Sequence, residues 1–155
     1  MENKTQVHAA DGKQEIILIR DFELPVELLF KAYEEPALFE QWMETKVLKM
    51  ENKKHGCFAF ETSRNGNVVF RANGTIHEFI PNQRITRTFE MENTPFPVQM
   101  EYLEFERLTD ETSRLTMHII FKSIEFRNQL MQMPFAQGIN MAHNKLQGII
   151  NNLKQ

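Results

Sequence analysis

The sequence has little of several features that mark particular classes of protein. Its 155 residues include one cysteine, six glycines and six prolines. No stretch approaches the ~20 apolar residues that a membrane-spanning helix needs. Cys57 has no second cysteine with which to form an intramolecular disulfide. The first residues also lack the basic cluster and apolar run of a secretory signal. We therefore expect a cytoplasmic protein with no membrane span.

Basic excess and metal-ligand patterns are missing as well. The net charge is −3, and the densest basic stretch, residues 49–55, is interrupted by Glu51. Because nucleic-acid affinity comes largely from phosphate neutralisation, we expect no nucleic-acid partner. The five histidines show no spacing such as H-x-x-x-H, and the scattered glycines form no phosphate-binding loop. The sequence therefore predicts neither a metal nor a cofactor.

What the chain does have is enough apolar material for a core. Hydrophobic residues make up 41% of it, and 13 residues are phenylalanine. Repeats, low-complexity tracts and Gly/Ser linkers are absent from the sequence. We predict a polar N-terminal extension over residues 1–14, followed by a single domain over residues 15–155.

The hydrophobic pattern changes its period twice along the chain. A β-branched run over residues 15–22 predicts a first strand. Pro25 and Pro36 then begin two short stretches of helical spacing that end at Trp42. Alternating patterns separated by turn residues such as Asn65-Gly66 follow, and they predict antiparallel hairpins. These strands are expected over residues 47–50, 57–62, 68–77, 84–91, 98–108 and 114–121.

The C-terminal part has helical spacing again. Ser123 is suited to cap a short helix, and Pro134 either kinks that helix or begins a second one. An amphipathic stripe then continues to Leu153. The expected fold is α+β: two short helices after the first strand, then a curved antiparallel sheet of about six to seven strands packed on a long C-terminal helix.

Three segments resemble a known family. They are RDFELP with LFKAYEEPALFEQW (residues 20–25 and 29–42), NGTIHEFIPNQRI (residues 73–85), and Gly138-Ile139 with Leu146. In order and spacing they resemble the SRPBCC (START/Bet v-like) superfamily, in the branch of the activator of heat-shock protein 90 ATPase C-terminal domain. The resemblance covers roughly residues 15–154.

The resemblance implies a helix-grip fold, in which the sheet wraps around the C-terminal helix and leaves an apolar cavity between them. The chain departs from the family at two positions. Met43 stands where the family often has an aromatic residue, and Ile139 stands where it often has tryptophan. Both changes replace stiff aromatic side chains, so a pocket inferred from relatives does not fix the pocket's shape here.

A sheet bent around one helix leaves more interior volume than close packing fills, so some apolar side chains are cavity candidates as well as core candidates. Among polar residues, Arg87 and His143 are candidates to orient a ligand. Tyr102 is a third, because it follows Val98 and Met100 on one strand face. The full candidate set is Trp42, Phe58, Phe60, Phe70, Ile76, Arg87, Phe89, Tyr102, Met117, Phe135, Ile139 and His143.

Three functions remain open from the sequence. The preferred one is a binding module for a small apolar or amphipathic molecule. The first alternative is an interaction module that acts on a chaperone or another protein, as the family's name suggests. The second is a cyclase- or dehydratase-like enzyme on a polyketide-like substrate, for which Tyr102, Glu104, His77 and His143 are the only acid–base suggestions. Exposed strand edges allow a monomer or a homodimer.

Overall fold

A computed structural model describes residues 3–154 of the protein. The first two residues of the expected extension and the last residue of the expected domain lie outside this range. Eight strands form one antiparallel sheet in the order β1-β2-β8-β7-β6-β5-β4-β3. Their bounds are β1 (Gln6–His8), β2 (Glu15–Phe22), β3 (Lys46–Met50), β4 (Cys57–Arg64), β5 (Asn67–Ile80), β6 (Arg84–Met91), β7 (Gln99–Arg107) and β8 (Ser113–Ile120).

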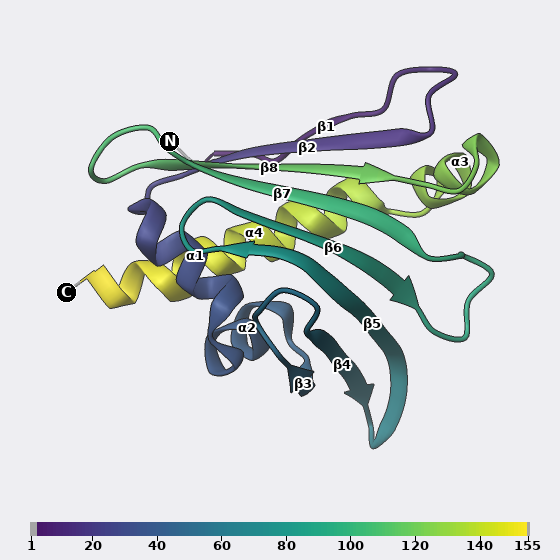
Figure 1. Ribbon diagram of the computed structural model, residues 1–155, viewed down its shortest axis with the longest axis horizontal. Helices are drawn as coiled ribbons and strands as arrows, with labels where there is room; N and C mark the ends of the chain where they lie inside the picture. The colour runs from purple at the N-terminus through teal and green to yellow at the C-terminus, as the bar shows by residue number, and fades with distance from the viewer. Residues whose placement is uncertain (1–2, 155) are drawn as a thin grey trace.

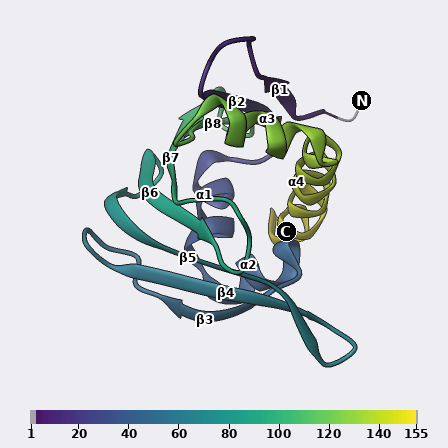
Figure 2. The ribbon, with the colours of Figure 1, turned by 90° about the vertical axis from the view of Figure 1, so that its right-hand side faces the viewer.

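The helices gather on one face of this sheet. They are α1 (Val26–Glu34), α2 (Pro36–Met43), α3 (Ile124–Gln132) and α4 (Phe135–Asn151), and a 3₁₀ turn (Asn152–Lys154) ends the described chain. The long α4 crosses behind the strands (Figure 1), and the sheet curves around the helices from β1 to β3 (Figure 2). This arrangement confirms the predicted α+β helix-grip fold. None of the helices within residues 3–154 is long and apolar enough to cross a membrane.

Local sequence sets where each helix begins. Pro25 is the N-cap of α1, and Pro36 occupies the first turn of α2. The Ser123 hydroxyl accepts a hydrogen bond from the backbone N–H of Phe126, at 3.3 Å, and so caps α3. Pro134 is the N-cap of α4, so of the two sequence alternatives it begins a second helix. These starts confirm the expected two short helices after β2.

The sheet has eight strands, one more than the six to seven expected, because β1 lies inside the expected N-terminal extension. This strand pairs with β2, with Gln6 opposite Ile19 and His8 opposite Ile17. The polar sequence of β1 carries no alternating hydrophobic pattern. Its pairing rests on backbone hydrogen bonds, which any sequence can supply at a sheet edge. Sequence periodicity therefore had no signal for it.

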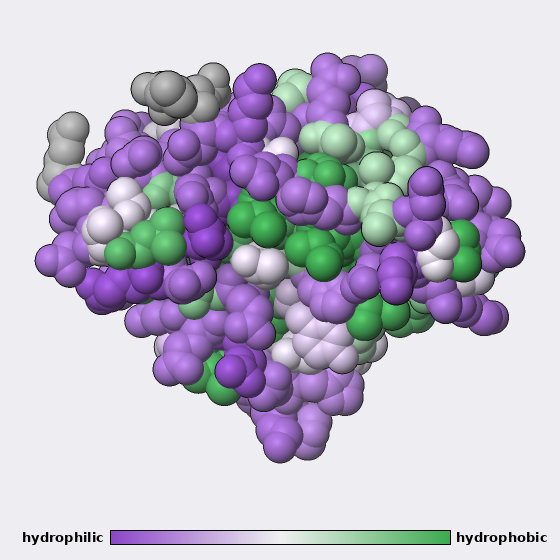
Figure 3. All heavy atoms as spheres, turned by 90° about the horizontal axis from the view of Figure 1, so that it is seen from above, coloured by the Kyte–Doolittle hydropathy of each residue, from purple (hydrophilic) through white to green (hydrophobic). Residues whose placement is uncertain are grey.

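The two faces of the sheet differ in what they cover. On β2, Ile16, Leu18 and Phe22 are fully buried on the concave face, whereas Ile17 and Ile19 are half-buried on the outer face. Seen from above, the molecule shows a hydrophobic area in the middle of a mostly hydrophilic surface (Figure 3). The apolar core therefore lies between the concave face and the helices.

Candidate functional site

An apolar cavity of about 200 Å³ lies between the concave face of the sheet and the helices. Side chains from β2, from β4 to β8 and from all four helices line it. The lining residues are Leu18, Tyr33, Phe39, Trp42, Met43, Phe60, Phe70, Arg87, Phe89, Met91, Gln99, Glu101, Met117, Ile119, Leu130, Phe135 and Ile139. A dry apolar cavity of about 150 Å³ is large enough to bind benzene, so this one can hold a small organic molecule.

Aromatic side chains form one side of the cavity. The ring centroid of Phe60 lies 5.2 Å from that of Phe39, 6.2 Å from that of Phe70 and 6.1 Å from that of Phe89. These residues come from β4, α2, β5 and β6, so the contacts join the far strands of the sheet to the second helix. Ring pairs at such separations are attractive beyond the area that they bury.

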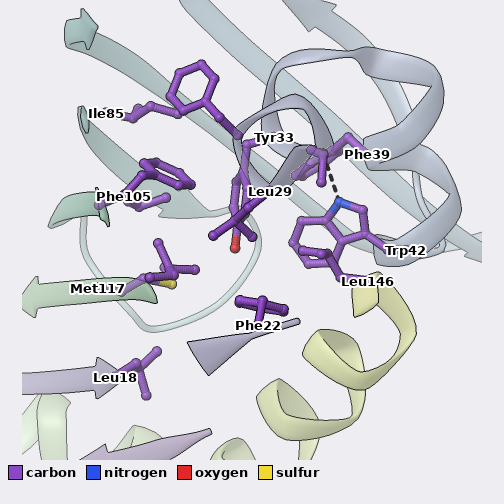
Figure 4. Close-up of a cluster of buried hydrophobic side chains, with 14 of the residues drawn as sticks. Leu18, Phe22, Leu29, Tyr33, Phe39, Trp42, Ile85, Phe105, Met117 and Leu146 are labelled. Carbon is purple, nitrogen blue, oxygen red and sulfur yellow. Dashed lines mark hydrogen bonds between the residues drawn. The ribbon is translucent and has the colours of Figure 1, made fainter. Parts of the chain in front are cut away.

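The indole of Trp42 is fixed by a buried hydrogen bond. Its Nε1–H donates to the backbone carbonyl of Ala32 at 2.9 Å (dashed line in Figure 4). Its ring also packs against Tyr33, with centroids 5.1 Å apart. Because a buried indole N–H needs an acceptor, this bond holds Trp42 in one orientation and ties α2 to α1.

A buried polar group interrupts the apolar lining on β6 and β7. Arg87 and Glu101 lie directly opposite each other in the register of these strands. Arg87 Nε donates to Glu101 Oε1 at 2.9 Å, and Gln99 Nε2 donates to Glu101 Oε2 at 2.9 Å. The guanidinium also lies over the ring of Phe58, 5.1 Å from its centroid. Both oxygens of the Glu101 carboxylate are therefore bonded, and its charge is balanced by Arg87.

Tyr33 brings a hydroxyl to the same cavity from α1. Its side chain is only 6% exposed. Burial raises the pKa of Tyr33, while the charges of Arg87 and Glu101 respectively lower and raise it. The hydroxyl therefore keeps its proton at neutral pH. It points away from Ile85 toward the side where Met117 lines the cavity (Figure 4).

The family described as Activator of Hsp90 ATPase homolog 1-like protein matches residues 23–151, which is most of the chain. The chain belongs to this family. Membership confirms the resemblance on the three segments quoted above. It fits a ligand-binding or interaction module, and it specifies neither a ligand nor a partner.

Solved structures similar to this activator-like protein come from several bacteria. The protein Ms6760 of Mycobacterium smegmatis is 18% identical, with a TM-score of 0.83 over 94% of this chain and 96% of that one. A Rhodobacter sphaeroides protein is 17% identical, with a TM-score of 0.84 over 96% and 99% of the two chains. A Staphylococcus epidermidis protein is 20% identical, with a TM-score of 0.80 over 95% and 94%. At these identities the likeness concerns the fold. Comparison with curated proteins gave no match.

Eight of the twelve cavity candidates from the sequence line the cavity of this family member: Trp42, Phe60, Phe70, Arg87, Phe89, Met117, Phe135 and Ile139. Phe58 and Ile76 are buried beside it, at 4% and 3% exposure. The sequence reasoning missed Gln99 and Glu101 on β7.

The assignment of faces on β7 needs correction. Gln99, Glu101, Leu103 and Phe105 face inward, whereas Tyr102 is 38% exposed on the outer face. The expectation took the face from Val98 and Met100, although Val98 lies just outside the strand and is itself exposed. Leu103 and Phe105 carried the signal for the other face. A shift of one residue then brings Glu101 inward.

His143 is buried, but away from the cavity lining, in a polar cluster between α4 and the N-terminal segment. Its Nδ1 lies 2.6 Å from Thr5 Oγ1. Arg20, 2% exposed, donates from Nη2 to Asn144 Oδ1 at 2.9 Å. Burial, with a smaller contribution from the charge of Arg20, lowers the pKa of His143 to about 3. The imidazole is therefore neutral at physiological pH and joins the N-terminal segment to α4.

The acid–base residues named for the enzyme alternative do not come together. Tyr102, Glu104 and His77 are exposed, and His143 lies in the polar cluster. None of these four residues is among the described residues that line the cavity. Within residues 3–154, no group of three or more His, Cys, Asp or Glu side chains is arranged to hold a metal ion.

Proposed function

We propose that this activator-like protein binds a small, mainly apolar organic molecule in the cavity between the sheet and α4. The observation that carries the proposal is the cavity itself: about 200 Å³ of space lined mostly by aromatic and aliphatic side chains. Ligand sites are typically concave and apolar with a few placed polar groups, and Arg87, Glu101 and Tyr33 supply such groups here.

The cavity volume limits the size of the occupant. Sites for drug-sized molecules measure about 300–1,000 Å³, whereas a benzene site measures about 150 Å³. At about 200 Å³, this cavity suits one substituted ring or a short branched chain. A polycyclic molecule requires its walls to move.

The Glu101 carboxylate has a fixed orientation. One of its oxygens accepts a hydrogen bond from Arg87, and the other accepts one from Gln99. An ion pair next to an apolar space provides a fixed polar end against which a ligand can be oriented.

Binding can be tested with isopropylbenzene as the probe and isothermal titration calorimetry as the measurement. Ile139→Trp places a larger side chain in the cavity, so we expect it to abolish binding. Ile120→Trp is the matched control, because Ile120 lies on β8 and is 38% exposed. Native mass spectra of the purified protein, compared with a denatured sample, test whether it carries a ligand.

Two results would count against the proposal. One is no heat of binding in the wild-type protein together with no added mass in its native spectra. The other is equal loss of binding in both tryptophan variants, which would place the probe outside the cavity or reflect general unfolding. Circular dichroism of each variant separates these last two explanations.

A further inference from the structure

The cavity contains hydrogen-bond donors that no described residue uses. The side chain of Tyr33 is 6% exposed, and its hydroxyl makes no hydrogen bond within residues 3–154. Arg87 uses Nε for Glu101, and its two terminal nitrogens donate to no residue in the same range. Within residues 3–154, neither the Tyr33 hydroxyl nor the Arg87 terminal nitrogens belong to the fully buried side-chain atoms that lack a partner, so these donors reach accessible space, where an oxygen of a ligand in the cavity can accept from them.

The charges at this end of the cavity already cancel. Arg87 is 13% exposed and Glu101 is 5% exposed, and they form an ion pair at 2.9 Å. An anionic ligand would leave one uncompensated negative charge in an apolar space, which is unfavourable. A cationic ligand would likewise leave one uncompensated positive charge, because Arg87 already balances Glu101. The site therefore favours a ligand that accepts hydrogen bonds without carrying a charge.

Both donors act from the same region. Tyr33, Arg87 and Glu101 all line the same cavity of about 200 Å³. Tyr33 belongs to α1, and the ion pair spans β6 and β7, so the donors converge from the helix layer and from the sheet.

We propose that this polar end receives an uncharged carbonyl oxygen, held by the Tyr33 hydroxyl and the Arg87 guanidinium, on a ligand of about one aromatic ring. This inference rests on the proposed function, because it assigns the ligand class of the same cavity. The ring occupies the apolar part of the cavity, between the phenylalanines of β4 to β6 and the helix α4. Glu101 keeps Arg87 in place and balances its charge.

Three probes of nearly equal shape separate the possible head groups. Acetophenone carries the neutral carbonyl, isopropylbenzene replaces it with a methyl-bearing carbon, and benzoate replaces it with a carboxylate. We expect calorimetry to show binding of acetophenone and isopropylbenzene, and at least tenfold weaker binding of benzoate at neutral pH.

The two tyrosines of the chain provide a matched pair of variants. Tyr33→Phe removes only the hydroxyl at the cavity, and Tyr102→Phe removes one that is on the outer face. We expect Tyr33→Phe to weaken acetophenone about tenfold and to leave isopropylbenzene unchanged, because a buried carbonyl loses one donor. Tyr102→Phe leaves both affinities at the wild-type value.

A second readout excludes a purely structural role for Tyr33. Without ligand its hydroxyl makes no hydrogen bond to a described residue, so Tyr33→Phe should keep the wild-type melting temperature. If acetophenone binds equally to wild type and Tyr33→Phe while isopropylbenzene still binds, the head-group assignment is wrong and the cavity function stands. Tighter binding of benzoate than of acetophenone also overturns the assignment. Failure of all three probes to bind contradicts the proposed function itself.

Discussion

Acidification from pH 7 to pH 5 is expected to destabilise the protein through His143. The ring is 1% exposed, and its pKa is lowered to about 3, chiefly by burial and also by Arg20. The same side chain in the unfolded chain has a pKa of about 6.5. Below pH 6.5 the unfolded state therefore binds a proton that the folded state does not. Because the folded pKa is the lower one, the free energy of unfolding falls as the pH falls through this window.

The size of this effect follows from the two pKa values. Each pH unit between them costs about 1.4 kcal/mol of stability. At pH 5, about 1.5 units below the unfolded pKa, His143 removes about 2 kcal/mol. The loss continues until the pH reaches the folded pKa near 3. For a domain with a typical unfolding free energy of about 5–15 kcal/mol, this is a measurable share.

Urea denaturation at pH 7 and pH 5 measures the effect in the wild type, His143→Gln and His8→Gln. His8 is an exposed histidine on β1 and serves as the control. The wild type and His8→Gln should lose about 2 kcal/mol more than His143→Gln between the two pH values. His143→Gln is expected to be less stable at pH 7, because it disturbs the contact with Thr5, so only the pH-dependent differences are compared. Equal losses in all three proteins would refute the reasoning.

Three further predictions concern the framework around the site. Gly74→Ala should lower the free energy of unfolding by about 1–3 kcal/mol, because a Cβ there overlaps a carbonyl of β6 and comes within 2.5 Å of a phenylalanine ring. At Gly148 an added Cβ has no neighbour within 4 Å, so Gly148→Ala should raise the free energy of unfolding by about 0.5–1 kcal/mol. Urea denaturation of both variants checks this contrast. Arg87→Met should cost about 3–5 kcal/mol, whereas Arg87→Met/Glu101→Leu should recover most of the loss; a double variant no more stable than the single one in urea contradicts this. Ser123→Ala should cost about 1 kcal/mol in thermal or urea denaturation, because α3 loses its cap, and an unchanged stability would show that the cap contributes nothing.

The helix starts were predictable from the sequence because single residues determine them. A proline in the first turn needs no acceptor for its nitrogen, and a serine hydroxyl satisfies an otherwise free N–H. Pro36 and Ser123 act in these ways in the structure, whereas the sequence left open whether Pro134, the N-cap of α4, kinks one helix or begins another. The strands from β4 to β8 were predictable for a similar reason, because their alternating pattern reflects one buried face.

The buried ion pair was only half predictable. Arg87 was a cavity candidate, but Glu101 was assigned to no site, because the inward face of β7 was taken from Val98 and Met100 and not from Leu103 and Phe105. Its position follows from register: Arg87 faces Glu101 across β6 and β7, and Ile119 faces it across β7 and β8. Such pairing is a property of three strands together, which a single segment does not encode.

The polar cluster around His143 was unpredictable for another reason. It depends on a long-range contact between Thr5 and α4, with Thr5 N–H donating to Asn140 Oδ1 at 2.9 Å. Neither the sequence around Thr5 nor the polar face of α4 has an apolar pattern that predicts this contact. The polar side chains of α4 face a second polar segment where solvent would otherwise be expected. The surroundings of this histidine therefore include Thr5, just before the edge strand β1, and the ring of Phe22.

Two of the cavity side chains, Met43 and Ile139, stand at the positions where the sequence departs from the pattern that the resemblance implies. In that pattern both positions are often aromatic. An indole at position 139 would take volume that this chain leaves open, while the walls from β4 to β6 would stay in place. In the proposed binding function, Met43 and Ile139 then affect the free volume of the cavity, and the pair Arg87–Glu101 sets the polarity at one end. The Ile139→Trp and Tyr33→Phe variants act separately on these two properties. We expect Ile139→Trp to change the size of ligand that the cavity accepts, and Tyr33→Phe to change only the preferred head group. Independent changes in these two properties would support this division.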